Sequence, residues 1–131
     1  MRVVLDASAA IEVALGRRQA AKLAETLEDA DVVLAPDLFV PEVVNTIWKY
    51  YQFENLSLDS CDRALESALG LVDALVSSKE VCSEAFLLAR TARRPAYDMF
   101  YLALARREDA ALLTTDRGLR KEADRQGVRV A

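Results

Sequence analysis

Residues 3–11 have the sequence VVLDASAAI, and the fold is decided by the change of pattern inside this stretch. The first three residues form an uninterrupted apolar run, which is typical of a strand buried on both faces of a parallel sheet. Asp6 ends the run, and the small residues after it predict the start of a helix that Gly16 interrupts. A buried strand followed directly by a helix is the repeating unit of an α/β fold.

The same alternation continues along the rest of the chain. Strands are expected at residues 2–6, 32–35, 72–78, 110–113 and 128–130, and helices at about 7–15, 18–30, 37–53, 57–71, 79–93, 98–108 and 117–126. Asp37 is the expected N-cap of the helix over 37–53. Strands that alternate with helices imply a parallel sheet covered on both sides, and we expect one domain over residues 1–131.

Composition limits the classes of function. The sequence has 131 residues, 53% of them hydrophobic and 29% charged, which fits one globular domain. No uncharged apolar run is long enough for a membrane span. The apolar stretch at the start of the sequence is too short for a signal peptide, so we expect a cytoplasmic protein. Histidine is absent, which excludes Ser-His and Cys-His mechanisms, and two distant cysteines cannot complete a structural zinc site.

Charge is distributed unevenly along the chain. The net charge of −4 argues by itself against a nucleic-acid partner. However, residues 1–89 carry 7 basic and 15 acidic side chains, whereas residues 90–131 carry 10 basic and 6 acidic ones. Most of the basic excess is arginine, whose planar fork matches phosphate oxygens. A solvated helix face would explain the same pattern, so this feature alone leaves the partner open.

Acidic residues end two of the expected strands. Asp6 closes the first strand, and Asp116 follows the strand over 110–113 after two threonines. Ligands of open α/β sheets bind beyond the carboxyl ends of the strands, so aspartates on neighbouring strands would face one crevice. Glu42 and Asp98 lie near the starts of two helices. Each acid taken alone also fits a helix cap or a first-turn position that complements the helix dipole.

The residues around these four acids form recognisable motifs. They are VLDASA at 4–9, PEVVN at 41–45, YDMFYLALA at 97–105 and LLTTDRGL at 112–119. In this order they resemble the motifs of the PIN-domain family, specifically of the VapC-type toxins of toxin–antitoxin pairs. The resemblance spans nearly the whole chain. It implies a three-layer α/β/α sandwich around a short parallel sheet, and an endoribonuclease that depends on Mg²⁺, for which Mn²⁺ can substitute.

The resemblance also implies roles for individual residues. The family's acidic quartet falls on Asp6, Glu42, Asp98 and Asp116; its supporting asparagine falls on Asn45; and small hydroxyl positions near the acids fall on Ser8 and Thr114. Two carboxylates about 4 Å apart repel by roughly 4 kcal/mol at an effective dielectric constant of 20, so a cluster of four predicts a divalent cation. Oxygen donors without histidine favour Mg²⁺ over softer metals.

The expected reaction is in-line hydrolysis of an RNA phosphodiester. Asp6 and Asp98 are the expected direct metal ligands, and Asp116 is expected to bind the ion directly or through water. Glu42 would hold a second ion or act as the base. Asn45, Thr114 and Ser8 would orient carboxylates by hydrogen bonds, although Ser8 also fits local backbone bonding at a helix start. Arg117, beside Asp116, is the expected phosphate contact in the RNA.

Four aromatic residues lie close together near the end of the helix over 37–53. They are Trp48, Tyr50, Tyr51 and Phe53. Four aromatics over six positions cannot share one helical face, so some are expected at an interface. The resemblance implies a homodimer and a small antitoxin that wraps its chain over the active-site side.

Two alternatives stay open at this point. A magnesium-dependent phosphatase or a receiver-type domain also places an aspartate at a strand end. The phosphatases have two aspartates that flank one residue, whereas Ser8 stands two positions after Asp6, and the only late lysine, Lys121, falls inside an expected helix. The other alternative is a non-catalytic PIN-like binding module, which would bind metal without turnover.

Overall fold

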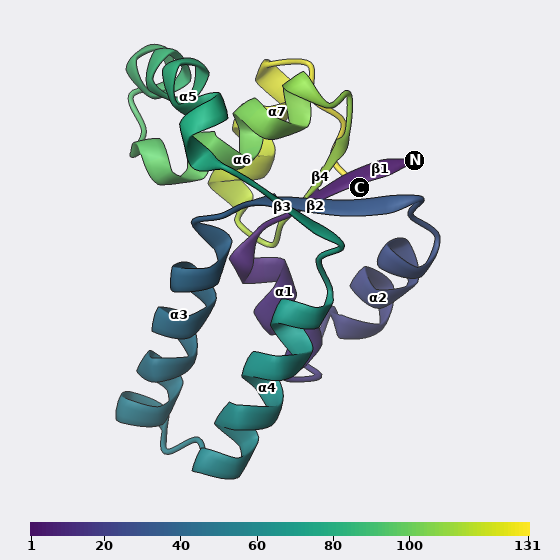
Figure 1. Cartoon of the computed structure of the whole chain (residues 1–131), viewed down its shortest axis with the longest axis vertical. Coiled ribbons are helices and arrows are strands. Elements are labelled where there is room, and N and C mark those ends of the chain that lie inside the picture. Colours follow the sequence, from purple (N-terminus) through teal and green to yellow (C-terminus); the bar gives the residue numbers. More distant parts are fainter.

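A four-stranded parallel sheet forms the middle layer of the molecule (Figure 1). The computed structural model describes residues 1–131. The strands are β1 (Arg2–Leu5), β2 (Val32–Pro36), β3 (Ala74–Val76) and β4 (Ala111–Leu113), in the order β3-β2-β1-β4. All three strand pairs are parallel, so the carboxyl ends of the strands lie along one edge.

Seven helices cover the sheet. They are α1 (Ala7–Ala14), α2 (Ala20–Glu28), α3 (Phe39–Glu54), α4 (Leu58–Gly70), α5 (Ser78–Ala92), α6 (Ala96–Arg107) and α7 (Arg117–Arg125). In Figure 1, α5, α6 and α7 lie on one side of the strands, and the other four helices lie on the opposite side. The expected three-layer α/β/α architecture is confirmed. Helices α3 and α4 form a hairpin that extends away from the sheet, and no helix has both the length and the apolarity that a membrane crossing requires.

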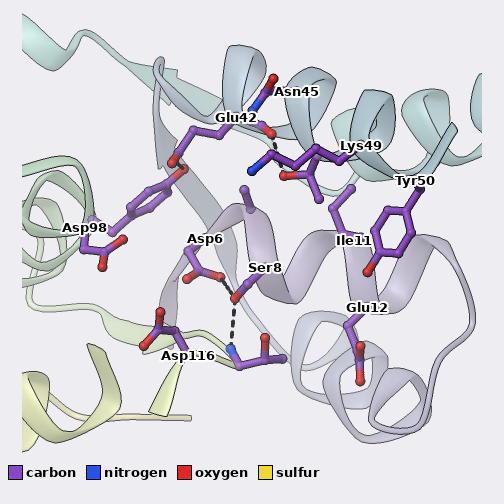
Figure 2. Close-up of a pocket in the computed structure, with 14 residues that line it drawn as sticks. Asp6, Ser8, Ile11, Glu12, Glu42, Asn45, Lys49, Tyr50, Asp98 and Asp116 are labelled. Carbon is purple, nitrogen blue, oxygen red and sulfur yellow. Dashed lines mark hydrogen bonds between the residues drawn. The ribbon is translucent and has the colours of Figure 1, made fainter. Parts of the chain in front are cut away.

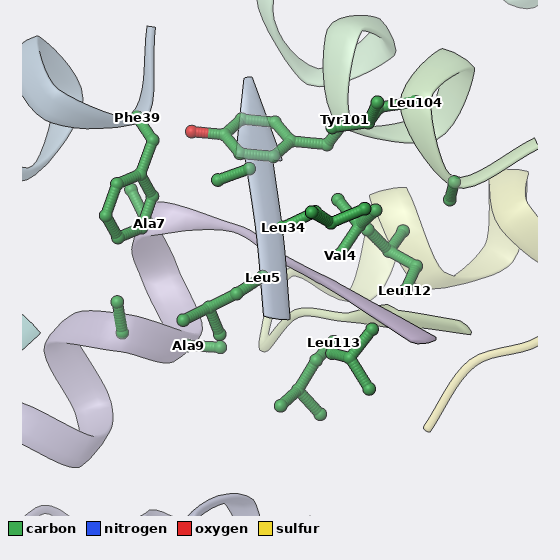
Figure 3. Packing of buried hydrophobic residues seen from close by; sticks show 14 of the residues in the cluster. Val4, Leu5, Ala7, Ala9, Leu34, Phe39, Tyr101, Leu104, Leu112 and Leu113 are labelled. Atoms are coloured by element: carbon green, nitrogen blue, oxygen red, sulfur yellow. The ribbon is translucent and has the colours of Figure 1, made fainter. Parts of the chain in front are cut away.

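The central strands are buried on both faces. Figure 3 shows Val4 and Leu112 packed beneath Tyr101 of α6, whereas Leu5 and Leu113 point to the opposite face. All these side chains are at most 2% exposed. This accounts for the uninterrupted apolar run of β1, because successive side chains of a strand point to opposite faces and both faces are covered here. Because these strand residues are buried, the polar residues that follow them lie at the carboxyl edge of the sheet.

Most element boundaries lie within two residues of those expected, but the role predicted for Asp37 was wrong. Helix α3 starts after Leu38 without a side-chain cap. The Asp37 carboxylate instead accepts hydrogen bonds from the backbone N–H of Ser78, at 3.1 Å, and from the Ser78 hydroxyl. The pairing of β2 with β3 brings Asp37 to the start of α5, where its own N–H donates to the Val76 carbonyl at 2.8 Å.

The strand expected over 128–130 is reduced to one bridge. Val130 pairs with Leu112 in parallel, and no further residue continues the ladder. Two hydrogen bonds hold it, from the Leu112 N–H to the Arg129 carbonyl and from the Ala131 N–H to the Leu112 carbonyl. Because β4 has only three residues, a strand along its free edge has little to pair with.

Candidate functional site

A cavity of about 370 Å³ opens at the carboxyl ends of β1 and β4 (Figure 2). All four predicted acids line it: Asp6, Glu42, Asp98 and Asp116. Each acid comes from a different element. Asp6 and Asp116 are the N-caps of α1 and α7, and Glu42 and Asp98 lie in the first turns of α3 and α6. Four helix N-termini therefore converge on one pocket, which favours negative charge there.

The helix-capping interpretation of the two strand-end aspartates describes real hydrogen bonds. The carboxylate of Asp6 accepts from the Ala9 N–H at 3.0 Å, and that of Asp116 accepts from the Leu119 N–H at 2.9 Å. Capping fixes the orientation of each carboxylate, but each has a second oxygen. The capping role and a role in the pocket are thus compatible.

Asp6 is the most buried of the four acids, with 5% of its surface exposed. The Ser8 hydroxyl donates to one of its carboxylate oxygens at 2.7 Å, and the Thr114 hydroxyl donates to the other. Burial raises the pKa of Asp6 to about 6, although the hydrogen bonds from Thr114, the Ala9 N–H and Ser8 oppose the rise; the nearby charge of Asp98 adds to it. Asp6 therefore ionises close to neutral pH.

Ser8 and Thr114 also tie the two strand ends together. The Ser8 hydroxyl accepts from the Thr115 N–H at 3.1 Å, and the Thr114 hydroxyl accepts from the Asp116 N–H at 3.0 Å. Both hydroxyls thus connect the residues after β1 with those after β4. Ser8 bonds to a carboxylate and to a distant backbone group rather than only to its own helix.

Glu42 is paired with a tyrosine that the sequence analysis did not identify. The Tyr101 hydroxyl donates a hydrogen bond to the Glu42 carboxylate. Burial raises the pKa of Glu42, the Tyr101 hydrogen bond partly offsets the rise, and the charge of Asp98 adds to it. Burial and Glu42 also raise the pKa of Tyr101, which therefore stays a hydrogen-bond donor. Its position three residues after Asp98, on the same helical face, was the available signal.

Asp98 and Asp116 share an arginine that the sequence analysis also missed. The Arg94 guanidinium Nη2 lies 3.2 Å from Asp98 Oδ2 and 3.8 Å from Asp116 Oδ1. Arg94 stands in the turn between α5 and α6, before Pro95. Arg94 stands four residues before Asp98 but outside helix α6, and nothing in the sequence pattern indicated its contact with Asp116.

Lys49 brings a positive charge to the same pocket. It lines the cavity with the acids, and Figure 2 shows its side chain extending from α3 toward them. Asn45 lines the cavity one turn earlier on the same helix, but its side chain makes no hydrogen bond to an acid. The spacing of Glu42, Asn45 and Lys49 by three and four residues is that of one helical face, which would have identified the lysine.

Arg117 lies outside the acidic pocket. It lines a neighbouring cavity together with Lys22 and Arg120, and Thr115 borders both cavities. The predicted phosphate contact is therefore beside the acids rather than among them.

The donors fit a hard divalent cation, because they are carboxylate, amide and hydroxyl oxygens. As the side chains stand, however, no three acids lie close enough together to hold one ion. Asp6 is held by Ser8 and Thr114, and Glu42 by Tyr101. The four acids share a pocket without being a preassembled set of ligands.

The aromatic residues of α3 divide between two faces, as expected. Trp48, Tyr51 and Phe53 are exposed, by 49%, 43% and 71%. Tyr50 instead lines the acidic pocket, and the Arg17 guanidinium lies 4.4 Å from the centre of its ring. Val44, Trp48, Tyr51, Leu58 and Leu65 line an apolar groove of about 200 Å³ between α3 and α4.

Known proteins show similarity over most of the chain. The sequence model of the PIN domain matches residues 3–124. Ribonuclease VapC3 of Pyrobaculum aerophilum is 32% identical over 121 residues, which cover 91% of this chain and 92% of that protein. The crystal structure of PAE2754 from the same organism has a TM-score of 0.74 at 20% identity, covering 93% of this chain and 79% of the other. This last likeness concerns the fold alone.

Proposed function

The chain belongs to the PIN-domain family and is of the VapC type, and on this premise we propose that it is a metal-dependent endoribonuclease, the toxin of a toxin–antitoxin pair. The observation that carries the proposal is the convergence of Asp6, Glu42, Asp98 and Asp116 on one pocket. Four acids at the carboxyl edge of a parallel sheet suit a site for a cation and a phosphate. Because the chain matches the PIN-domain family, we prefer this function to that of a phosphatase or a receiver-type domain.

The proposed ion is Mg²⁺, with Mn²⁺ as a substitute. Asp6 and Asp98 would hold it directly, and Asp116 would hold it directly or through water. When bound, such an ion activates water and stabilises the charge that develops on the phosphate. Asp6 is suited to this role because Ser8, Thr114 and the Ala9 N–H fix its carboxylate. An ion would also favour the ionised form of this buried acid.

Glu42 is the proposed general base. Its raised pKa brings it closer to neutral pH, where a base transfers protons most efficiently. The Tyr101 hydroxyl fixes the direction of its carboxylate. Asn45, on the next turn of α3, is proposed to orient the acids or the substrate through its amide.

RNA is the proposed substrate, and basic residues on both sides of Thr115 would bind its backbone. Lys49 stands inside the acidic pocket, and Arg117, Lys22 and Arg120 line the adjoining cavity. This arrangement answers the objection from net charge, because four of the acids belong to the site itself. A strand that crosses Thr115 would place one phosphate among the acids and others beside these cations.

A cognate antitoxin is the proposed protein partner, and a homodimer is the proposed assembly in the cytoplasm. The apolar groove between α3 and α4 is the proposed place of the antitoxin contact, because Trp48 and Tyr51 line it with half-exposed aromatic rings. Exposed aromatic groups of this kind are common at protein interfaces.

The test is a cleavage assay on total RNA with Mg²⁺, with Mn²⁺ or with EDTA, comparing the wild type with Asp6→Asn. Asp59→Asn is a matched control, because Asp59 is exposed on α4 and pairs only with Arg63. We expect cleavage that needs the metal, persists in Asp59→Asn and disappears in Asp6→Asn. Equal cleavage by all three proteins would refute the site. Metal binding without cleavage of any RNA would identify a non-catalytic PIN module instead.

A further inference from the structure

Arg94 forms ion pairs with two of the four acids of the site. Its Nη2 lies 3.2 Å from Asp98 and 3.8 Å from Asp116. The two acids stand at the starts of different helices, α6 and α7. The side chains of all three residues are partly shielded from water, with exposures of 27% for Arg94, 33% for Asp98 and 45% for Asp116. One guanidinium therefore offsets the repulsion between two carboxylates.

The turn before α6 holds Arg94 in this place. Arg93 ends α5 in the left-handed conformation, with φ 54°, and the Arg94 N–H donates to the Ala89 carbonyl at 3.2 Å. The Nε of Arg94 is buried and has no hydrogen-bond partner. A buried donor without a partner is costly. The position of the arginine thus follows from its contacts to the two acids rather than from full hydrogen bonding of its own side chain.

Gly118 leaves the space that the guanidinium fills. A Cβ at residue 118 would lie 2.4 Å from Arg94 Nη1 and 3.0 Å from Nη2. Gly118 is in α7 with φ outside the left-handed region, so its backbone does not require glycine. Alanine is the better helix former by roughly 1 kcal/mol. The missing side chain is explained by the close approach of Arg94.

We propose that Arg94 is a resident counter-cation of the acidic pocket, which neutralises Asp98 and Asp116 in the absence of a divalent ion and competes with that ion for them. The inference rests on the proposed function, because it concerns the affinity of that site for its metal. A guanidinium and a divalent ion repel each other, and both need the same carboxylates.

The expected effect is moderate because the ion pairs are partly exposed. Pairs of this kind change an equilibrium by a few-fold each, so removal of both should tighten divalent-ion binding roughly two- to twenty-fold. The direction of the change in divalent-ion affinity distinguishes the two possible roles of Arg94. If Arg94 only held the fold together, its loss would leave the metal affinity unchanged or reduce it.

The test is a Mn²⁺ titration of the intact protein without RNA, followed by electron paramagnetic resonance. The variants are Arg94→Gln, Arg94→Lys, Gly118→Ala and the double variant Arg94→Gln/Gly118→Ala. Arg90→Gln is the control, because it removes a positive charge from a side chain that stacks on Phe86, 4.9 Å from the ring centre. Asp98→Asn reports whether the ion uses the acidic pocket at all.

We expect Arg94→Gln to bind Mn²⁺ about tenfold more tightly, and Arg94→Lys to stay near the wild type because the charge is kept. Gly118→Ala should tighten binding in the same direction by pushing the guanidinium away from the acids. In the Arg94→Gln background, Gly118→Ala should leave the Mn²⁺ affinity unchanged, because no guanidinium remains to be displaced. Arg90→Gln should match the wild type. If Arg94→Gln does not fold, Gly118→Ala carries the test with the same expected sign.

Unchanged or weaker Mn²⁺ binding by Arg94→Gln and Gly118→Ala would overturn the inference. The inference would also be overturned if Gly118→Ala changed the Mn²⁺ affinity by the same factor in the Arg94→Gln background as in the wild type. If Asp98→Asn still lost Mn²⁺ affinity in either case, the proposed function would stand. If neither the wild type nor Arg94→Gln bound Mn²⁺, the metal site and this inference would both be wrong.

Discussion

The Asp6 carboxyl is harder to ionise in the folded protein than in the unfolded chain, because it is buried. Burial raises its pKa from 3.8 to about 6 despite three hydrogen bonds to the carboxylate. Between these two pH values the folded state binds more protons than the unfolded state, so stability falls as the pH rises through this window and stays lower above it. At 1.36 kcal/mol per pKa unit, the ionised carboxylate costs about 3 kcal/mol near neutral pH.

Asp6→Asn is therefore expected to stabilise the protein while it removes activity. Asparagine caps helices as well as aspartate does, so the start of α1 is kept. In EDTA at pH 7.5 the free energy of unfolding should rise by about 1–3 kcal/mol, and at pH 4 the gain should be small. Urea unfolding at both pH values measures it. Destabilisation at pH 7.5, or a larger gain at pH 4, would contradict the proposed environment of Asp6.

Tyr101→Phe tests the role of Glu42 as the base. The Tyr101 hydrogen bond lowers the pKa of Glu42, so its removal should raise that pKa further. The acidic limb of the pH–rate profile should move to higher pH, with a loss of up to about tenfold in rate on that limb. An unmoved limb would show that another group titrates in the rate.

Lys49→Ala and Arg117→Ala are expected to weaken RNA binding and to flatten its dependence on salt. Each phosphate contact that is lost should reduce the logarithmic slope by about 0.7 for single-stranded RNA. Lys79→Ala is a suitable control, because Lys79 is exposed on α5 away from both cavities. If the slope with Lys49→Ala or Arg117→Ala equals that of the control, that residue does not contact phosphate.

At the scale of elements, the α3–α4 hairpin carries the proposed partner surface. Trp48 is the only tryptophan and is half-exposed, so its fluorescence reports directly on this groove. Binding of the cognate antitoxin should bury the ring and shift its emission to shorter wavelength. Emission that does not move at saturating antitoxin would place the contact elsewhere.

The elements themselves were predictable where one local pattern determines them. The run Val3 to Leu5 predicted β1, and the helix expected over 57–71 is α4, which Ser57 caps through the Ser60 N–H at 3.1 Å. The cap predicted for Asp37 failed because a distant partner, Ser78, competes for its carboxylate. Tertiary contacts decide such cases, and a local pattern does not contain them.

The candidate site, like the helices and strands, was predictable in part from the sequence. The motifs located the four acids that share the pocket and the hydroxyls of Ser8 and Thr114 that hold Asp6, but not the other groups that contact the acids. Tyr101 and Lys49 lie at helical spacing from the predicted site residues Asp98 and Glu42, so they could have been identified from the sequence. Arg94 could not, because its contact with Asp116 depends on how the turn before α6 meets α7 and on the space at Gly118.

For the whole molecule, the parallel sheet is what unites the site. The acids are spread from residue 6 to residue 116, and the adjacent strands β1 and β4 place Asp6 and Asp116 at one edge. The helices α3 and α6 add Glu42 and Asp98 from the two sides. The arrangement collects four of the 21 acidic side chains in one pocket, with basic residues of the C-terminal third beside it.

The most direct test of the central claim is an anomalous difference map from a crystal of the protein soaked in Mn²⁺. We predict a peak in the acidic pocket at bonding distance from carboxylate oxygens of Asp6 and Asp98, because a hard divalent ion takes oxygen ligands. The same peak should be missing from Asp98→Asn crystals. A peak only elsewhere on the wild-type protein, or none at saturating Mn²⁺, would contradict the assignment of this pocket as the metal-dependent active site.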